Sequence, residues 1–281
     1  MVAQSPLRGA SQSIRETAHA KINLALHVRG RREDGYHELE TLFAFVDAGD
    51  RLIARPAKED RVTTIGEFAG GIENPFDNLV AKALAAMPRS QGLEITLEKN
   101  LPVAAGLGGG SADAGAVFRI VMAEYGFRDG WEAKAAALGA DVPACVASIA
   151  CVGRGTGTQL APVLNDLEGT PVLLVNSRVP LATGPVFKAW DGIDRGPLPQ
   201  GTAREIALAG RNDLTEPALD LAPEIGQVLA ELEAGDSWLV RMSGSGATCF
   251  ALYESEAARD QALRRIASER PYWWWLAGKL R

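Results

Sequence analysis

A run of glycines within residues 100–115 is the clearest indication of chemistry in this sequence. The segment, here called the glycine loop, reads Asn-Leu-Pro-Val-Ala-Ala-Gly-Leu-Gly-Gly-Gly-Ser-Ala-Asp-Ala-Gly. Residues 93–98 before it alternate as in a half-buried strand, and residues 111–125 carry apolar side chains at helical spacing. Such a succession aims backbone N–H groups at one point, which can bind an anion such as phosphate. Ser111 or the residues just before it would cap the helix, and Asp113 in its first turn would favour its positive end.

Two common glycine motifs do not match this loop. A Walker loop needs a lysine after its last glycine, and none follows Gly110. A dinucleotide fingerprint counted from Gly106 places Ser111 where the third glycine should stand. A flexible surface turn is the alternative, but each glycine costs about 0.5–1 kcal/mol of backbone entropy where regular structure would do. Close approach of a ligand to bare backbone would account for them.

Two polar side chains interrupt an apolar segment near the N-terminus. Residues 15–28 are expected to form one or two strands, in which Lys21 and Asn23 face the same side. A lysine on such a strand is unusual unless its ammonium group meets an anion. A structural salt bridge would explain it equally well.

Other elements follow from patterning in the first half of the chain. We expect strands at 39–46 and 50–55, a helix opened by Asp77 over 77–84, a helix over 131–138 ended by Gly139, and a hairpin turn between 150 and 160. Asp141 then stands at a helix-to-strand corner and opens an apolar element that runs through Cys151. From the local sequence, a cap on that element is the simplest role for its carboxylate.

The second half is expected to begin after a boundary at 162–169. Its predicted elements are a buried strand at 171–176, an irregular segment with two prolines at 179–187, a helix capped at 212–214, a helix at 223–233, strands at 237–242 and 247–253 around a turn, a helix at 254–268 and a last strand at 272–276. This order is that of an antiparallel α+β domain.

Composition limits the class of protein. The chain has 281 residues, 47% of them hydrophobic, with a net charge of −6, which argues against nucleic acid or an anionic membrane as the main partner. No apolar run approaches the roughly 18 residues of a membrane span, and residues 1–13 are expected to be a short disordered tail. The odd count of three cysteines suggests a reducing compartment, so a cytoplasmic location is expected. The three histidines are too scattered for a zinc site.

Three segments together resemble the GHMP family of small-molecule kinases. They are the loop at 102–112, Ala-Lys-Ile-Asn-Leu at 20–24, and Met-Ser-Gly-Ser-Gly-Ala at 242–247. The triple glycine and Asp-Gly-Tyr-His at 34–37 resemble the branch that uses ATP to phosphorylate the 2-hydroxyl of a CDP-alcohol in the non-mevalonate isoprenoid pathway. The homoserine and mevalonate branches usually have a shorter Gly-Leu-Gly-Ser-Ser core.

The resemblance implies an α+β fold of two domains. Residues 14–162 would form an N-terminal domain like domain 2 of ribosomal protein S5, and residues 163–281 a ferredoxin-like C-terminal domain. The implied ligands are ATP, Mg²⁺ and a CDP-alcohol, with no nucleic-acid or membrane partner. The implied assembly is a monomer or weak homodimer.

The resemblance also implies roles for individual residues. Lys21 and Asp141 match the catalytic pair, in which the aspartate accepts the hydroxyl proton and the lysine stabilises the incipient alkoxide. The residues implied to bind ATP are Asn78, Pro102, Val103, Ala104, Ala105, Gly106, Leu107, Gly108, Gly109, Gly110, Ser111 and Ala112. The residues implied to bind the CDP-alcohol are Asn23, Tyr36, His37, Thr183 and Phe187. The two aromatic rings would sandwich cytosine, and His37 would bond its edge.

The chain departs from the family pattern at two positions. Ser111 is followed by Ala112 where a second serine is frequent, and Arg241 stands where a lysine is common. No clear glutamate for Mg²⁺ is recognisable, so the metal ligands stay open.

Two rival interpretations remain at this stage. The first is another GHMP kinase, of the homoserine or mevalonate type, although neither substrate has a base to stack on Tyr36 and Phe187. The second is a non-catalytic nucleotide-binding regulator, although such a protein would be expected to lose the lysine, the aspartate or the glycines.

Overall fold

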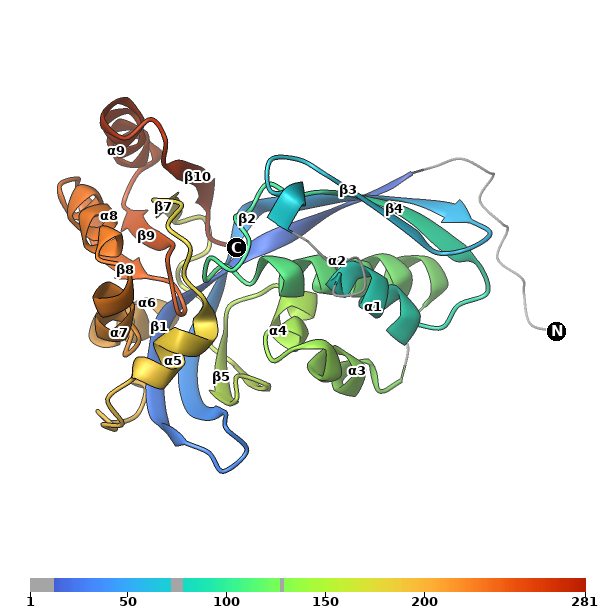
Figure 1. The fold of residues 1–281 in the computed structure, drawn as a ribbon, viewed down its shortest axis with the longest axis horizontal. Coiled ribbons are helices and arrows are strands. Elements are labelled where there is room, and N and C mark those ends of the chain that lie inside the picture. Colours follow the sequence, from blue (N-terminus) through green and yellow to red (C-terminus); the bar gives the residue numbers. More distant parts are fainter. Residues whose placement is uncertain (1–12, 72–77, 127–128) are drawn as a thin grey trace.

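A long pair of antiparallel strands runs through the middle of the protein (Figure 1). These strands are β1 (Ile14–Arg31) and β2 (His37–Ala57). The computed structural model describes residues 13–71, 78–126 and 129–281. Most of the expected N-terminal tail and the expected helix cap Asp77 lie outside these residues.

The two strands expected at 39–46 and 50–55 are one continuous strand, β2. Gly49 does not turn the chain between them. A Cβ atom at Gly49 would lie 1.9 Å from the backbone oxygen of Ala18 in β1, so a glycine is needed for the close passage of two strands. The separate-strand prediction was therefore wrong because close strand packing, rather than a turn, accounts for this glycine.

The first sheet is built around β2. One edge of β2 pairs with β1, and the other pairs with β5 along its first half and with β4 along its second half. The remaining strands of this sheet are β3 (Arg61–Ile65), β4 (Gly92–Glu98), β5 (Cys151–Gly155) and β6 (Gln159–Pro162), of which only β3 and β4 pair in parallel among the described residues. The predicted strand before the glycine loop and the predicted hairpin at 150–160 are confirmed.

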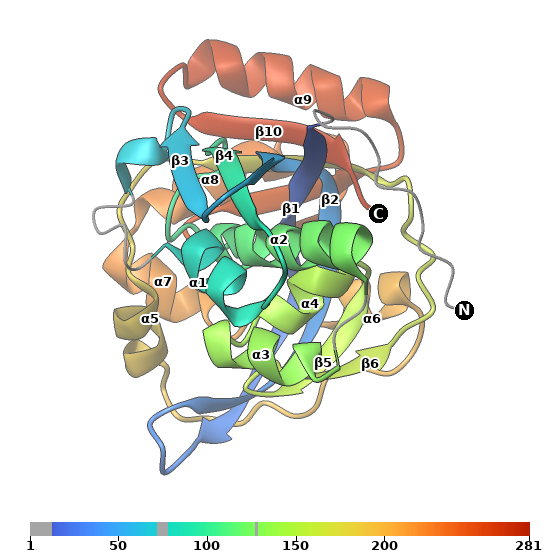
Figure 2. The same cartoon turned by 90° about the vertical axis from the view of Figure 1, so that its right-hand side faces the viewer.

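Four α-helices cover one face of this sheet (Figure 2). They are α1 (Leu79–Ala86), α2 (Gly109–Tyr125), α3 (Trp131–Leu138) and α4 (Val142–Ala147), and a short 3₁₀ turn, η1 (Ala69–Gly71), follows β3. Phe118 of α2 is fully buried in one hydrophobic core with Phe43 and Phe45 of β2. This core fixes α2, and with it the glycine loop, against the sheet.

The structure settles one expectation about α2 and corrects another. The helix begins at Gly109 after the N-cap Gly108, so a residue just before Ser111, and not Ser111 itself, holds the cap position, and no side chain caps the helix. Asp113 lies beyond the first turn and is buried, 2.8 Å from the ammonium group of Lys99. Burial raises the pKa of Asp113 to about 8, although Lys99 opposes the shift. Long-range pairing, rather than the helix dipole, therefore accounts for Asp113.

The second sheet has the strand order β10-β7-β9-β8 with antiparallel neighbours, the arrangement of a ferredoxin-like domain. Its elements are β7 (Pro171–Asn176), α5 (Thr183–Ala189), α6 (Ala203–Ala209), α7 (Thr215–Leu221), α8 (Glu224–Glu233), β8 (Ser237–Met242), β9 (Cys249–Tyr253), α9 (Glu256–Glu269) and β10 (Trp274–Lys279). The α+β fold class is confirmed, whereas the division at residue 162 stays a prediction. In the described part of the chain, no helix is long and apolar enough to cross a membrane.

One expectation in the second half was wrong. The segment 179–187 is not irregular throughout, because α5 begins at Thr183. Pro185 stands in its first turn, where a backbone N–H has no intrahelical partner and can be dispensed with. The predicted cap at 212–214 is confirmed, because Leu214 occupies the N-cap position of α7 and Oδ1 of Asn212 accepts the backbone N–H of Leu214 at 3.0 Å. The amide group of Asn212 also donates to the carbonyls of Met242 and Gly244 at 2.8 Å each.

Candidate active site

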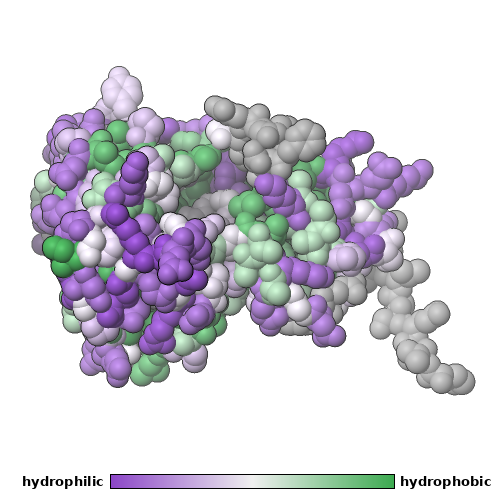
Figure 3. Space-filling model, turned by 60° about the horizontal axis from the view of Figure 1, so that its bottom comes forward, coloured by the Kyte–Doolittle hydropathy of each residue, from purple (hydrophilic) through white to green (hydrophobic). Residues whose placement is uncertain are grey.

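A cleft of about 760 Å³ lies where the two halves of the protein meet, on the hollowed face in Figure 3. Its walls come from β1, β2, the glycine loop, α5 and the turn between β8 and β9. The residues expected to bind or react that line it are Lys21, Asn23, Tyr36, His37, Ala104, Ala105, Gly106, Gly108, Gly109, Gly110, Ser111, Asp141, Thr183 and Phe187. The structure thus brings together residues that are far apart in the sequence.

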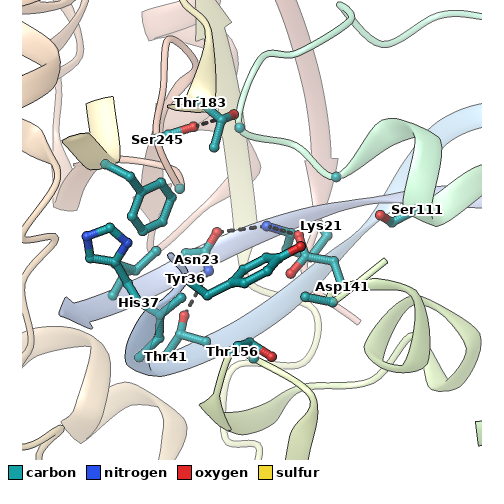
Figure 4. A pocket seen from close by; sticks show the side chains of 18 of the residues that line it. Lys21, Asn23, Tyr36, His37, Thr41, Ser111, Asp141, Thr156, Thr183 and Ser245 are labelled. Atoms are coloured by element: carbon teal, nitrogen blue, oxygen red, sulfur yellow. Dashed lines mark hydrogen bonds and ion pairs between the residues drawn. The ribbon is translucent and has the colours of Figure 1, made fainter. Parts of the chain in front are cut away.

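Lys21 is the centre of a polar chain on the floor of the cleft (Figure 4). Its Nζ lies 3.0 Å from Oδ2 of Asp141 and donates to Oδ1 of Asn23 at 2.9 Å. The amide group of Asn23 donates to Oγ1 of Thr41 at 2.8 Å, and that hydroxyl donates to the carbonyl of Ala25 at 2.7 Å. The predicted shared face of Lys21 and Asn23 is therefore confirmed. Lys21 holds its position because each group in the chain has a partner.

The Asp141 side chain faces the cleft and does not cap a helix. It precedes α4, so its corner joins two helices instead of the expected helix and strand. Although it occupies the N-cap position of α4, its side chain makes no capping hydrogen bond. The Asp141 side chain is 31% exposed, whereas that of Lys21 is only 5% exposed. The carboxylate therefore faces the cleft and the ammonium lies behind it.

The three consecutive glycines each meet a different neighbour. A Cβ atom at Gly108 would lie 2.9 Å from Cε of Lys21, one at Gly109 would lie 3.4 Å from Nζ of Lys99, and one at Gly110 would lie 3.3 Å from a methyl group of Leu79. Gly108 also has a φ of +59°, which disfavours other residues. The loop therefore lies against Lys21 at Gly108, where a side chain would not fit without a shift.

The remaining residues expected to bind ATP lie outside the cleft lining. Pro102, Leu107 and Ala112 are buried, and Val103 is 45% exposed. Asn78 accepts a hydrogen bond from the backbone of Val80 as the N-cap of α1. It also lines a second cavity of about 440 Å³. Their contacts with ATP stay predictions.

Gly108→Ala is expected to raise the KM for ATP about tenfold, because the left-handed backbone costs about 1–2 kcal/mol and the methyl group would push against Lys21. Steady-state kinetics of ADP release would measure the effect. Gly126→Ala is a matched control, since Gly126 has a φ of +84° and a Cβ atom there would meet nothing within 4 Å. Equal KM values for ATP in the two variants would contradict this explanation of the glycine.

Aromatic rings gather at the other end of the cleft. The rings of His37 and Phe187 lie 5.0 Å apart between centroids, and the ring of Trp190 stands edge-on to His37 at 5.8 Å. Tyr36 is 64% exposed and reaches over the cleft floor in Figure 4. Burial, and then the charge of Arg31, lower the pKa of His37. The imidazole is therefore neutral at pH 7 and can both donate and accept a hydrogen bond.

The turn between β8 and β9 ties the glycine loop to β1. Oγ of Ser243 donates to the carbonyl of Gly106 at 2.8 Å and accepts the backbone N–H of Asn23 at 3.1 Å. Gly106 needs its glycine because a Cβ atom there would lie 2.2 Å from the carbonyl oxygen of Ser243. The hydroxyls of Ser245 and Thr183 lie 3.0 Å apart at the cleft wall. One turn thus fixes the loop relative to the polar chain of Lys21.

Arg241, whose role the sequence left open, is structural. Its guanidinium donates to the carbonyls of Leu24, Ala207 and Gly210. Burial lowers its pKa to about 10. A side chain whose donors are directed at backbone oxygens is not available to bind phosphate.

Several cleft residues carried no recognisable signal in the sequence. They are Arg31, Thr41, Thr156, Lys188 and Ser245. Thr41 and Thr156 lie in ordinary strand and turn contexts, and only the pairing of distant segments brings them to the cleft. The spacing of Ser245 within the motif at 242–247 was the one available hint.

The fold and the cleft together define a small-molecule kinase of two domains. Family models agree: "GHMP kinases N terminal domain" matches residues 78–151, and "GHMP kinases C terminal" matches residues 199–271. The chain belongs to the GHMP kinase family.

Individual similar proteins indicate the branch of the GHMP kinase family to which the chain is related. A 4-diphosphocytidyl-2-C-methyl-D-erythritol kinase from Novosphingobium aromaticivorans is 66% identical over 276 residues, which span 98% of this chain and 96% of that protein. A crystal structure of 4-(cytidine 5'-diphospho)-2C-methyl-D-erythritol kinase is 35% identical, with a TM-score of 0.79 and coverage of 95% of this chain and 99% of the other. A homoserine kinase from Cytophaga hutchinsonii, 15% identical with a TM-score of 0.68 over 99% of this chain and 98% of its own, shares the fold alone. Within its family, the chain therefore belongs to the 4-diphosphocytidyl-2-C-methyl-D-erythritol kinases.

Proposed function

We propose that the chain transfers the γ-phosphoryl group of ATP to the 2-hydroxyl of 4-diphosphocytidyl-2-C-methyl-D-erythritol, in the non-mevalonate isoprenoid pathway. The observation that carries this proposal is the arrangement of the cleft. The Lys21–Asp141 pair lies directly against the glycine loop, and the aromatic group of His37 and Phe187 lies in the same cleft. One end of the cleft suits a triphosphate and the other end suits a base. The Lys21–Asp141 pair lies in the same cleft and can act on the acceptor hydroxyl.

At the ATP end, the glycine loop would hold the phosphates. The start of α2 presents unpaired backbone N–H groups with the positive end of the helix dipole, and the glycines leave that backbone open to approach. Asn78 lines the second cavity, and its neighbour in the chain, Leu79, lines the cleft together with Gly110, so the adenosine would extend in that direction.

Magnesium would accompany ATP and neutralise charge between its phosphates. Among the described residues, no group of three His, Cys, Asp or Glu side chains is arranged to hold a metal ion. Mg²⁺ in such sites binds mainly through substrate phosphates and water with one or two protein groups. The described cleft lining offers the hydroxyl of Ser111 beside the loop.

At the reactive centre, Asp141 would receive the proton of the acceptor hydroxyl as the phosphoryl group arrives. The ammonium of Lys21, 3.0 Å away, would stabilise negative charge that develops on the acceptor oxygen. The same ion pair fixes the orientation of the Asp141 carboxylate. Lys21 and Asp141 would therefore orient the acceptor hydroxyl and stabilise the charge on its oxygen at least as much as they remove its proton.

At the acceptor end, Tyr36 and Phe187 would stack on cytosine from both sides, and the neutral His37 would bond its edge. Nε2 of His37 is buried and has no hydrogen-bond partner in the described part of the chain. Asn23 and Thr183 would bind the polyol. Arg31 and Lys188 also line the cleft and add positive charge for a diphosphate.

A substrate comparison tests this function. ADP release from ATP would be measured with 4-diphosphocytidyl-2-C-methyl-D-erythritol, homoserine and mevalonate as acceptors. We expect kcat/KM for the CDP-alcohol to exceed the other two by about 10³-fold or more, because they leave the polar groups of the base site unpaired. A preference for homoserine or mevalonate would reject the assignment. Nucleotide binding without transfer to any acceptor would favour the non-catalytic regulator.

The assembly and location are part of the same proposal. We infer a monomer or weak homodimer in the cytoplasm, free of nucleic-acid and membrane partners. The cysteines support a reducing compartment, since Cys145, Cys151 and Cys249 are buried and unpaired. Burial raises the pKa of each of the three thiols, which keeps them unreactive.

A further inference from the structure

Three ionisable side chains form a buried cluster directly behind the glycine loop. Lys99 follows β4, Asp50 lies in β2, and Asp113 lies in the second turn of α2. Nζ of Lys99 donates to Oδ2 of Asp113 at 2.8 Å and also to Oδ2 of Asp50. Each of the three side chains is at most 3% exposed. Because water does not screen these charges, the loss of one partner is felt strongly by the others.

This Lys99 cluster holds the glycine loop at both of its ends. Oδ1 of Asp50 accepts the backbone N–H groups of Asn100 at 2.6 Å and Leu101 at 2.8 Å, where the loop begins. Asp113 belongs to the helix into which the loop leads. The ammonium of Lys99 connects the two carboxylates, so the start of the loop and the start of α2 are tied to β2 through a single atom.

The Lys99 cluster also lies close to Gly109, in the part of the glycine loop that would bind phosphate. A Cβ atom at Gly109 would lie 3.4 Å from Nζ of Lys99 and 3.7 Å from Oδ2 of Asp50. Gly109 is the first residue of α2, where the free N–H groups of the helix gather. A shift of the Lys99 ammonium would therefore move the groups that hold the triphosphate.

We propose that the Lys99 cluster keeps the glycine loop in its nucleotide-binding shape and that Asp113 is a positioning residue for ATP. The inference rests on the proposed function for its kinetic readout. Asp113 does not line the cleft and acts through Lys99. Without the Asp113 oxygen, the ammonium keeps only Asp50, and the start of α2 loses its polar link to β2. Groups that bind a transition state need such fixed support.

Asparagine at position 113 should serve nearly as well as aspartate. Only Oδ2 of Asp113 has a partner, because Oδ1 makes no hydrogen bond in the described part of the chain. An asparagine oxygen can accept from Lys99 in the same way. The role therefore needs an oxygen acceptor at this place rather than a second negative charge.

The test compares Asp113→Ala with Asp113→Asn in the full chain. Calorimetry would measure the affinity for the non-hydrolysable analogue AMP-PNP, and steady-state kinetics would give the KM for ATP and for the CDP-alcohol. For Asp113→Ala we expect the Kd for AMP-PNP and the KM for ATP to rise about tenfold, because this variant loses one hydrogen bond to a charged group. The KM for the CDP-alcohol should stay within about twofold. Asp113→Asn should restore the affinity for nucleotide.

Glu16→Gln is the matched control. Glu16 pairs with Arg119 of the same helix at 3.0 Å, so this variant removes a charged partner of α2 away from the loop. It should leave the nucleotide affinity unchanged while thermal melting reports any loss of stability. If Asp113→Ala does not fold, Asp113→Ser replaces it, since a serine is too short to reach Lys99.

Three results would overturn the proposal. They are unchanged AMP-PNP affinity in Asp113→Ala, equal increases in the KM of both substrates, and an Asp113→Asn variant as impaired as Asp113→Ala. The calorimetric comparison needs no phosphoryl transfer. If the unmodified chain were inactive, the proposed function would fail while the AMP-PNP result still decided the role of the cluster.

Discussion

Asp141→Asn is expected to lower kcat about 10²- to 10⁴-fold, the usual contribution of a positioned acid or base. Asparagine keeps the shape of the side chain and can still accept a hydrogen bond from Lys21, but it cannot take a proton. The glycine loop makes no use of Asp141 in the structure, so the KM for ATP should stay within about twofold. Substrate-dependent ADP release under saturating ATP and CDP-alcohol would measure both quantities.

The size of the Asp141 effect separates two roles for the carboxylate. If Asp141 takes the proton early, the fall in kcat should approach about 10⁴-fold. If it mainly orients the hydroxyl, asparagine should retain more activity than Asp141→Ala. Asp260→Asn is the control, since Asp260 is an exposed carboxylate paired with Arg259 at 2.7 Å on α9. Full activity of Asp141→Asn would exclude both roles.

The centre of the cleft could be predicted because its signals are local. Lys21 and Asn23 alternate on one strand, and a period of two residues places both on one face whatever the strand packs against. The glycine loop lies between a strand and a helix that are patterned strongly. Asp141, by contrast, was assigned through the family resemblance, and the tertiary structure places its carboxylate 3.0 Å from Lys21.

The residues that could not be predicted depend on distant partners. Asp113 in a helical sequence looks like a favourable charge near a helix start, and only the fold shows Lys99 and Asp50 beside it. Gly49 looks like a turn, and only the fold shows the Ala18 backbone against it. Pro185 suggests an irregular chain in the sequence, although the first turn of a helix tolerates proline.

The residues at the acceptor end of the cleft could be predicted only in part. Tyr36 and His37 were assigned through the family resemblance, because an aromatic residue in a charged loop carries no signal of its own. Their partner Phe187 comes from α5, a helix that the sequence did not predict. The 5.0 Å approach of the rings of His37 and Phe187 therefore depends on a long-range contact between β2 and α5. Local patterning cannot supply it.

Lys21→Met is expected to lower kcat about 10²- to 10³-fold. This is the usual effect of removing one group that stabilises the charge developing in the transition state. Methionine has nearly the length of the lysine stem, and its thioether can fill the position beside the ring of Phe43, whose centroid lies 5.4 Å from Nζ. The main loss is thus the positive charge. Lys279→Met is the control, since Lys279 forms a partly exposed pair with Glu256 at 2.7 Å.

The double variant Lys21→Met with Asp141→Asn makes the sharper prediction. The two side chains share one ion pair, so each single change already leaves the other group without its function. We therefore expect the kcat of the double variant to lie within about tenfold of the kcat of the less active single variant, because the effects of residues that act as a unit are strongly non-additive. The same kinetic assay under saturating substrates measures the cycle. Effects that simply multiplied would show that Lys21 and Asp141 act independently, and the shared reactive centre proposed for this cleft would then be wrong.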